Sequence, residues 1–176
     1  MKGQVKNLVY AGACLAIGIV LPSLFHIVGW SGPILLPMHI PVLLCGLICG
    51  WYFGGLCGLM VPLLCSILTG MPPLFPFGVA MMLELCTYGI LCGLLYKKFK
   101  INIYVSLIGA MLGGRIVNGI ANTILLGFSG QDYGFKAFIS GAFVTALPGI
   151  IIQIVLIPVI IIALTKANLI DNPKKA

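Results

Sequence analysis

The chain has 176 residues, of which 61% are hydrophobic and only 7% are charged, with a mean hydropathy of +1.19. A soluble domain carries roughly 25% charged residues, so this composition excludes a soluble globular protein and predicts an integral membrane protein. The formal net charge is +7, but the basic residues other than Arg115 stand at or beyond the ends of apolar segments. That placement favours contact with membrane lipid and argues against a nucleic-acid partner.

Apolar segments recur along the whole chain and predict one membrane domain, residues 1–176, folded as an all-α bundle. A membrane helix needs about 20 residues. We therefore expect six transmembrane helices, at residues 6–27, 39–53, 55–70, 77–97, 103–127 and 137–165. The second and third are short, and only the sequence "WYFGG" separates them, so they form either two spans or a re-entrant pair.

Basic residues indicate how the helices are oriented. They precede the first predicted span (Lys2, Lys6) and follow the fourth (Lys97, Lys98, Lys100) and the sixth (Lys166, Lys174, Lys175). All three groups fall on one side, which the positive-inside rule makes cytoplasmic, so both termini are expected in the cytoplasm. The predicted outer loops, 28–38, 69–78 and 127–136, are rich in Gly, Pro and aromatic residues, as is typical of compact loops.

The seven cysteines all lie inside apolar segments, which argues against a disulfide framework. Cys45 and Cys49 are one helical turn apart, which could suit a soft metal, but no histidine or carboxylate is expected to converge on them, so they are interpreted as packing residues. We expect no metal and no cofactor. The sequence also lacks a GxxxxGK[ST] phosphate loop and the HExxH and GxSxG motifs, so we expect neither ATP hydrolysis by this chain nor an enzyme.

Ionisable groups inside apolar segments are costly and are therefore candidates for function. Glu84 lies in the predicted fourth helix, with Thr87 and Tyr88 extending its face. Arg115 lies near the middle of the fifth, where Asn118 and Asn122 follow at i+3 and i+7. Two helices thus each carry a polar stripe. The cytoplasmic half of the bundle is expected to carry little polar character beyond Gln153 in the sixth helix.

Two interpretations of these stripes remain open. Glu84 and Arg115 form either an ion pair that fastens two helices or part of an outward-facing pocket for a small molecule. His39 stands between two prolines at the start of the second helix, and we expect it at the rim of such a pocket. Trp30 in the first outer loop is either an interfacial aromatic residue or a side chain that stacks on a planar ligand.

Four stretches, in this order and spacing, resemble the substrate-binding S components of energy-coupling factor (ECF) vitamin transporters. They are "KNLVYAGACLAIG", "LPMHIPVLLCGLICG", "ILTGMPPLFP" and "GGRIVNGI". The first contains a patch of small residues, Gly12, Ala13 and Ala16, of the kind that lets another helix approach closely. The family commonly has AxxxA here, and Gly12 replaces the first alanine.

The resemblance implies a multi-pass protein of a bacterial-type cell membrane that captures a small vitamin or precursor outside the cell. It also implies docking through the first helix on an ECF scaffold (T) subunit driven by two cytoplasmic ATPase subunits. Together with the polar stripes it predicts a set of ligand-binding residues: Trp30, His39, Glu84, Tyr88, Arg115, Asn118 and Asn122. The vitamin stays open among pantothenate, a pyridoxine-like or pyrimidine precursor and a benzimidazole riboside.

Two other functions compete with this prediction. A stand-alone secondary carrier or channel needs no partner subunits. A small membrane enzyme would use His39 and Glu84 as acid and base. Co-purification of partner subunits and recovery of an unchanged ligand separate these functions.

Overall fold

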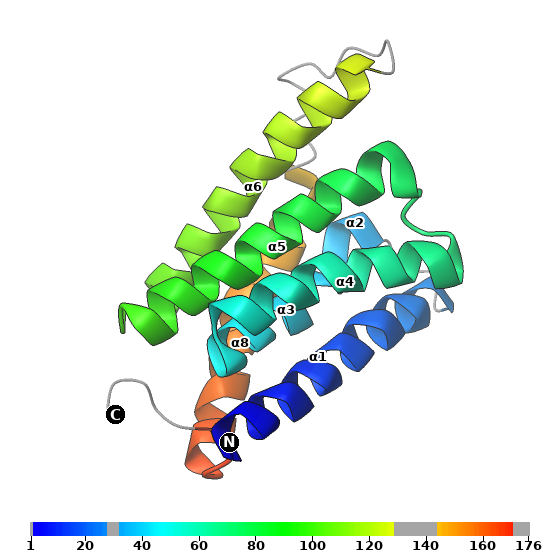
Figure 1. Cartoon of the computed structure of the whole chain (residues 1–176). Coiled ribbons are helices and arrows are strands. Elements are labelled where there is room, and N and C mark those ends of the chain that lie inside the picture. Colours follow the sequence, from blue (N-terminus) through cyan, green and yellow to red (C-terminus); the bar gives the residue numbers. More distant parts are fainter. Residues whose placement is uncertain (1, 28–31, 129–143, 171–176) are drawn as a thin grey trace.

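The computed structural model describes residues 2–27, 32–128 and 144–170, and this part of the chain is helical without strands (Figure 1). Its helices are α1 (Lys2–Ile27), α2 (Gly32–Leu35), α3 (His39–Cys49), α4 (Trp51–Thr69), α5 (Val79–Gly93), α6 (Ile103–Phe128) and α8 (Leu147–Lys166). Two irregular helical segments, η1 (Leu74–Gly78) and η2 (Leu94–Lys98), extend α5 at its two ends.

Five helical segments of the described chain are long and apolar enough to cross a membrane: Gln4–Phe25, Trp51–Thr69, Leu74–Lys98, Ile103–Gly127 and Leu147–Lys166. They correspond to the first, third, fourth, fifth and sixth predicted helices, which confirms an all-α membrane protein. The sixth begins at Leu147, where 137 was expected, and residues 137–143 lie outside the described residues.

The second predicted helix is broken. α3 has only 11 residues, about 16 Å of helix at 1.5 Å per residue, which is half of a bilayer core of about 30 Å. Its last residue, Cys49, donates its S–H to the Asn7 carbonyl near the start of α1, 3.4 Å away. Between the end of α1 and Cys49 the chain therefore returns through the membrane to the level at which α1 starts. It does so through α2, a turn and α3, which together form a discontinuous span.

The boundary between α3 and α4 differs from the prediction. The predicted helices were 39–53 and 55–70, but the observed helices separate at Gly50, whose φ of +97° is a conformation that suits glycine. Gly54 lies inside α4, where a Cβ would meet the Gly89 carbonyl oxygen of α5 at 2.6 Å. This glycine thus permits close helix packing and does not form a turn.

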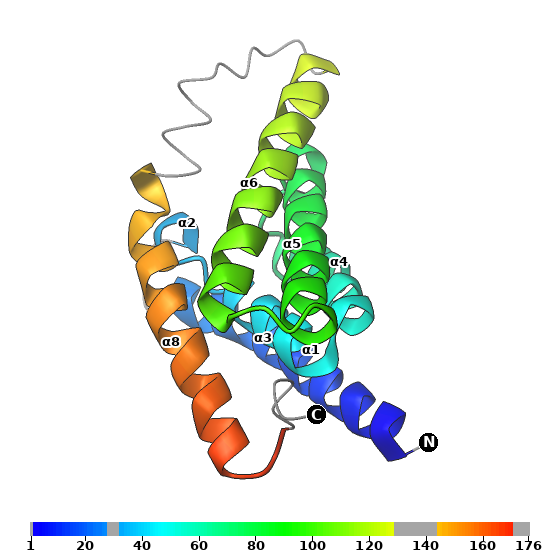
Figure 2. The ribbon, with the colours of Figure 1, turned by 90° about the vertical axis from the view of Figure 1, so that its left-hand side faces the viewer.

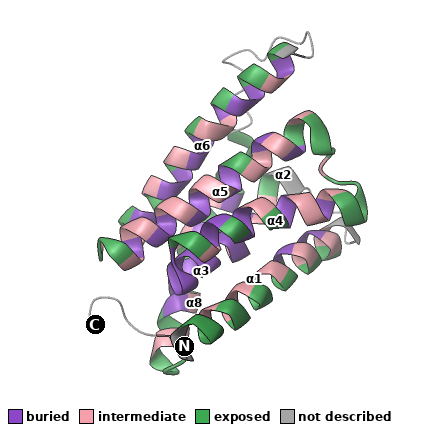
Figure 3. Ribbon diagram, in the orientation of Figure 1, coloured by how far each residue is buried: buried purple, intermediate pink, exposed green. Residues whose placement is uncertain are grey.

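The short helix α3 occupies the centre of the bundle. Nine of its 11 residues are buried, and it contacts α1, α4, α5 and α8. Figure 3 shows α3 almost wholly buried while the outer helices present exposed faces. Large apolar side chains fill those exposed faces on α1, α6 and α8, as expected of surfaces in contact with lipid.

The beginning of α1, the segment η2 and the end of α8 lie at one end of the bundle (Figures 1 and 2). Tyr10 of α1 donates its hydroxyl to the Leu169 carbonyl just after α8, at 2.8 Å. The basic groups of these three segments therefore share one end, as the charge pattern predicted. We refer to this end as the inner end and to the opposite one as the outer end.

Candidate functional site

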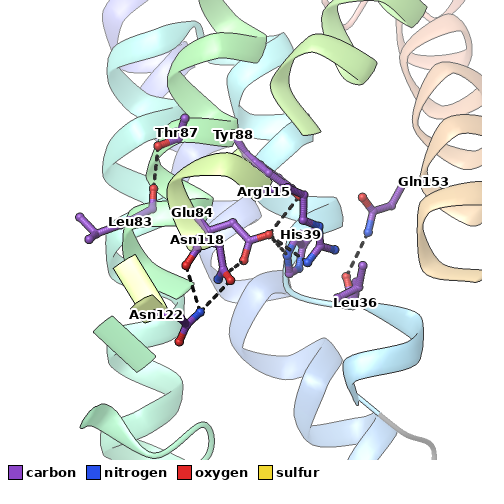
Figure 4. Close-up of polar contacts among 10 residues, drawn as sticks. All are labelled: Leu36, His39, Leu83, Glu84, Thr87, Tyr88, Arg115, Asn118, Asn122 and Gln153. Carbon is purple, nitrogen blue, oxygen red and sulfur yellow. Dashed lines mark hydrogen bonds and ion pairs between the residues drawn. The ribbon is translucent and has the colours of Figure 1, made fainter. Parts of the chain in front are cut away.

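The carboxylate of Glu84 is the centre of a buried polar cluster between α5 and α6 (Figure 4). Its Oε1 lies 3.1 Å from Nη1 of Arg115 and accepts the Tyr88 hydroxyl at 3.1 Å. Its Oε2 accepts Nδ2 of Asn118 at 2.7 Å. Three donors on two helices thus hold one carboxylate, which is only 2% exposed.

The cluster continues along α6 toward the outer end. Asn122 donates its Nδ2 to the side-chain oxygen of Asn118 at 2.8 Å and to the Asn118 backbone carbonyl at 3.1 Å. Because residues four apart stand on one face of a helix, this contact follows directly from the sequence spacing. The two asparagines therefore connect Glu84 to the outer half of α6.

His39 joins the cluster from α3. Its Nε2 lies 3.7 Å from Oε1 of Glu84, which is close enough for an ion pair but too long for a hydrogen bond. Its ring meets the Tyr88 ring edge-on, with centroids 5.3 Å apart. The sequence predicted His39 at the rim of a pocket. It is only 2% exposed, so it lies inside the bundle.

The turn before α3 places His39 at this depth. Leu36 has a φ of +50°, and its carbonyl accepts both the His39 backbone N–H at 3.1 Å and Nε2 of Gln153 at 3.5 Å. Gln153 belongs to α8 and is 1% exposed. The amide of α8 therefore helps to hold the turn that carries His39.

Sequence reasoning had placed Gln153 in the inner half of the membrane and had given it no role. It lies six residues into α8, on the outer half of that helix, beside the turn at Leu36. One signal could have found it, since Gln153 is the only amide side chain in the 20 residues of α8.

Five buried atoms of the cluster have no hydrogen-bond partner: Nε and Nη2 of Arg115, Nδ1 and Nε2 of His39, and Oδ1 of Asn122. A buried polar group without a partner costs about 1–3 kcal/mol. An ion pair that only fastened two helices would not need to leave so many groups unpaired. We refer to the six side chains of the whole cluster as the Glu84 network: His39, Glu84, Tyr88, Arg115, Asn118 and Asn122.

Gly114 gives Tyr88 its place in the network. A Cβ at Gly114 would collide with two ring carbons of Tyr88 and would lie 3.0 Å from the Glu84 carbonyl oxygen. The "GG" before Arg115 in "GGRIVNGI" therefore includes a position at which the ring lies directly against the α6 backbone.

Other predicted residues lie elsewhere. Trp30 falls outside the described residues. Thr87 donates to the Leu83 carbonyl of its own helix at 2.8 Å and does not extend the face of Glu84 (Figure 4). Phe75 and Phe77, two aromatic residues of the predicted outer loop 69–78, are about half exposed, at 55% and 50%.

The small-residue patch of α1 lies on the outside of the bundle. Gly12, Ala13 and Ala16 are all exposed, and a Cβ at Gly12 would meet nothing within 4 Å. Packing against the described residues of this chain therefore does not account for the small residues at these positions.

No group of three or more His, Cys, Asp or Glu side chains within the described ranges is arranged to hold a metal ion. All seven cysteines are described, and each is a free thiol. The Glu84 network offers hydrogen-bond donors and acceptors, one carboxylate and one guanidinium. This chemistry suits binding of a small polar molecule.

The sequence was compared with known families and proteins. Residues 6–161 match the sequence model of one family, the substrate-specific component of ECF transporters. Comparison with curated proteins and with solved structures gave no match. The matched range contains all six residues of the Glu84 network, the small-residue patch of α1 and Gln153.

Proposed function

Because the chain belongs to the substrate-specific components of ECF transporters, we propose that it captures a small vitamin or vitamin precursor at the Glu84 network. The observation that carries this proposal is the set of buried, unpartnered atoms on Arg115, His39 and Asn122. A bound molecule with matching groups would satisfy them, and unsatisfied buried groups are rare without such a reason.

The depth of the network supports capture from the outer end. Arg115 lies at the middle of α6, and Asn122 lies six residues before the end of that helix, about 9 Å below it at 1.5 Å per residue. Glu84 lies five residues after the start of α5. The polar groups thus run from the middle of the bundle toward its outer end, which is the side where a substrate taken up by the cell arrives.

Delivery across the membrane belongs to partner subunits in this proposal. The sequence carries no phosphate loop of its own. Exposed Gly12, Ala13 and Ala16 leave a smooth strip on α1, and small residues let another membrane helix approach closely. We therefore assign α1 to contact with an ECF scaffold (T) subunit, which two cytoplasmic ATPase subunits drive.

A transport experiment tests this division of labour. The double variant Gly12→Leu with Ala16→Leu places two large side chains on the strip, so co-purification of the scaffold and uptake should be lost while ligand binding stays. Gly127→Leu is the matched control, because it is another exposed helical glycine whose Cβ would meet nothing within 4 Å.

Three results would oppose the proposal. Wild-type uptake in vesicles that contain no partner subunits would indicate a stand-alone carrier. Full uptake by the α1 double variant would show that the strip is not the docking surface. A chemically altered molecule recovered after incubation would indicate an enzyme.

A further inference from the structure

The unpartnered atoms of the Glu84 network also indicate which chemical groups its ligand carries. Resting on the proposed function, we propose that the ligand has a carboxylate, bound by the Nε–Nη2 edge of Arg115, and a separate hydrogen-bond donor for Asn122.

The guanidinium of Arg115 is used on one side only. Nη1 lies 3.1 Å from Glu84, whereas Nε and Nη2 are buried without partners. These two nitrogens form one edge of the planar group, and their N–H bonds point the same way. That edge matches the two oxygens of a carboxylate, which it binds through two parallel hydrogen bonds.

Glu84 does not compete for this edge. Its carboxylate already accepts hydrogen bonds from Tyr88 and Asn118 and faces Nη1 of Arg115. His39 is buried beside the same carboxylate, and neither of its ring nitrogens makes a hydrogen bond. Since Nε2 is the ring nitrogen that faces Glu84, Nδ1 is the one open to the ligand, as a donor or an acceptor according to the tautomer.

The outer end of the network has an acceptor that needs a hydrogen-bond donor from the ligand. Asn122 donates its Nδ2 to Asn118, whereas its Oδ1 is buried without a hydrogen-bond partner. A hydroxyl or amide N–H of the ligand would complete it. Arg115 and Asn122 are seven residues apart on α6, about 10 Å along the helix axis, so the carboxylate and the donor belong to opposite ends of an elongated molecule.

A ligand panel tests this inference on the purified full-length protein, with thermal unfolding in detergent as the measurement. The elongated acids are pantothenate and biotin, each paired with its uncharged counterpart, panthenol and biotinamide. Nicotinate with nicotinamide is the short pair. Thiamine, riboflavin, pyridoxine, a hydroxymethylpyrimidine and a benzimidazole riboside are vitamins or precursors without a carboxylate.

We expect an elongated acid to raise Tm and its uncharged counterpart to bind at least about tenfold more weakly, because a charge-assisted pair is lost. Arg115→Lys keeps the charge but removes the paired donors, so it should reduce this acid preference about tenfold or more. Thr123→Val is the matched control on α6, since the Thr123 hydroxyl bonds only its own helix, at the Gly119 carbonyl.

The outcomes separate the two proposals. Tight binding of a panel member that has no carboxylate, without binding of any acid, would overturn the carboxylate inference and support the proposed function. Equal affinity for an acid and its uncharged counterpart would overturn the inference as well. If no member of the panel binds at millimolar concentration, the proposed capture of a vitamin fails with it. If Arg115→Lys does not fold, the affinity of the wild type for an acid relative to its uncharged counterpart still tests the carboxylate inference.

Discussion

Arg115 on α6 contacts Glu84 on α5 through a single nitrogen, Nη1, at 3.1 Å, although both side chains are more than 90% buried. A bidentate pair would satisfy more of the guanidinium. The one-sided contact instead leaves Nε and Nη2 unpartnered. The pair therefore joins two helices and at the same time presents a charged edge inside the bundle.

The first prediction concerns removal of the buried carboxylate. Glu84→Gln leaves the Arg115 guanidinium buried without a counter-charge, so the free energy of unfolding should fall by about 3–5 kcal/mol. Chemical unfolding in detergent measures this loss. Thr87→Val, one turn further along α5, removes a hydroxyl that bonds only its own helix and should be nearly neutral. Equal stability of the two variants would mean that the ion pair does not hold α5 and α6 together.

The second prediction separates fastening from binding. Glu84→Met combined with Arg115→Met removes both charges, so it should recover much of the stability that either single change loses. The double variant should nevertheless bind no ligand. A double variant that is folded and still binds with wild-type affinity would place the ligand elsewhere.

The third prediction concerns the contact between Gly114 and Tyr88. Gly114→Ala pushes a methyl group into the Tyr88 ring, so the hydroxyl that donates to Glu84 must move and ligand affinity should fall by about tenfold, the loss of one hydrogen bond. Gly109→Ala on the same helix meets only the end of the flexible Leu95 side chain, at 3.1 Å. Isothermal titration should show a much smaller loss there. The same affinity in both variants would remove Tyr88 from the site.

The fourth prediction concerns the support that α8 gives to the turn before α3. Gln153→Leu removes the donor to the Leu36 carbonyl, so stability should fall by about 1 kcal/mol and ligand affinity should fall because His39 is less firmly held. Thr165→Val on the same helix is the control, because that hydroxyl bonds the Ile161 carbonyl of α8 itself. Unchanged affinity in Gln153→Leu would show that α8 has no part in positioning His39.

Hydropathy was sufficient to predict the long spans, since a run of about 20 apolar residues has few alternatives to a membrane helix. It did not predict the discontinuous second span. The positive φ of Leu36 and the burial of α3 depend on α1, α4, α5 and α8 packing around that segment. A local sequence pattern does not contain those contacts.

Helical spacing brought most of the candidate residues to the right face. Glu84 and Tyr88 are four residues apart, as are Asn118 and Asn122. Within each pair the two side chains form a hydrogen bond. Whether they bind a ligand stays a prediction. Thr87 was assigned wrongly to this face, because a threonine hydroxyl inside a helix often bonds the carbonyl four residues back and needs no other partner.

The depth assigned to Gln153 failed for a different reason. We expected its helix to begin at residue 137, which would place Gln153 sixteen residues inside the membrane. α8 begins at Leu147, so the same residue lies about 9 Å from the outer end of that helix. The contact between Gln153 and the turn at Leu36 thus places this amide nearer the outer end than the sequence suggested.

The central claim is that the Glu84 network holds the substrate of this ECF component, and native mass spectrometry of the ligand retained on purification tests it most directly. We predict that wild-type protein and Thr123→Val retain the same small molecule, whereas the folded Glu84→Met and Arg115→Met double variant retains none. Equal retention by the double variant would contradict the account.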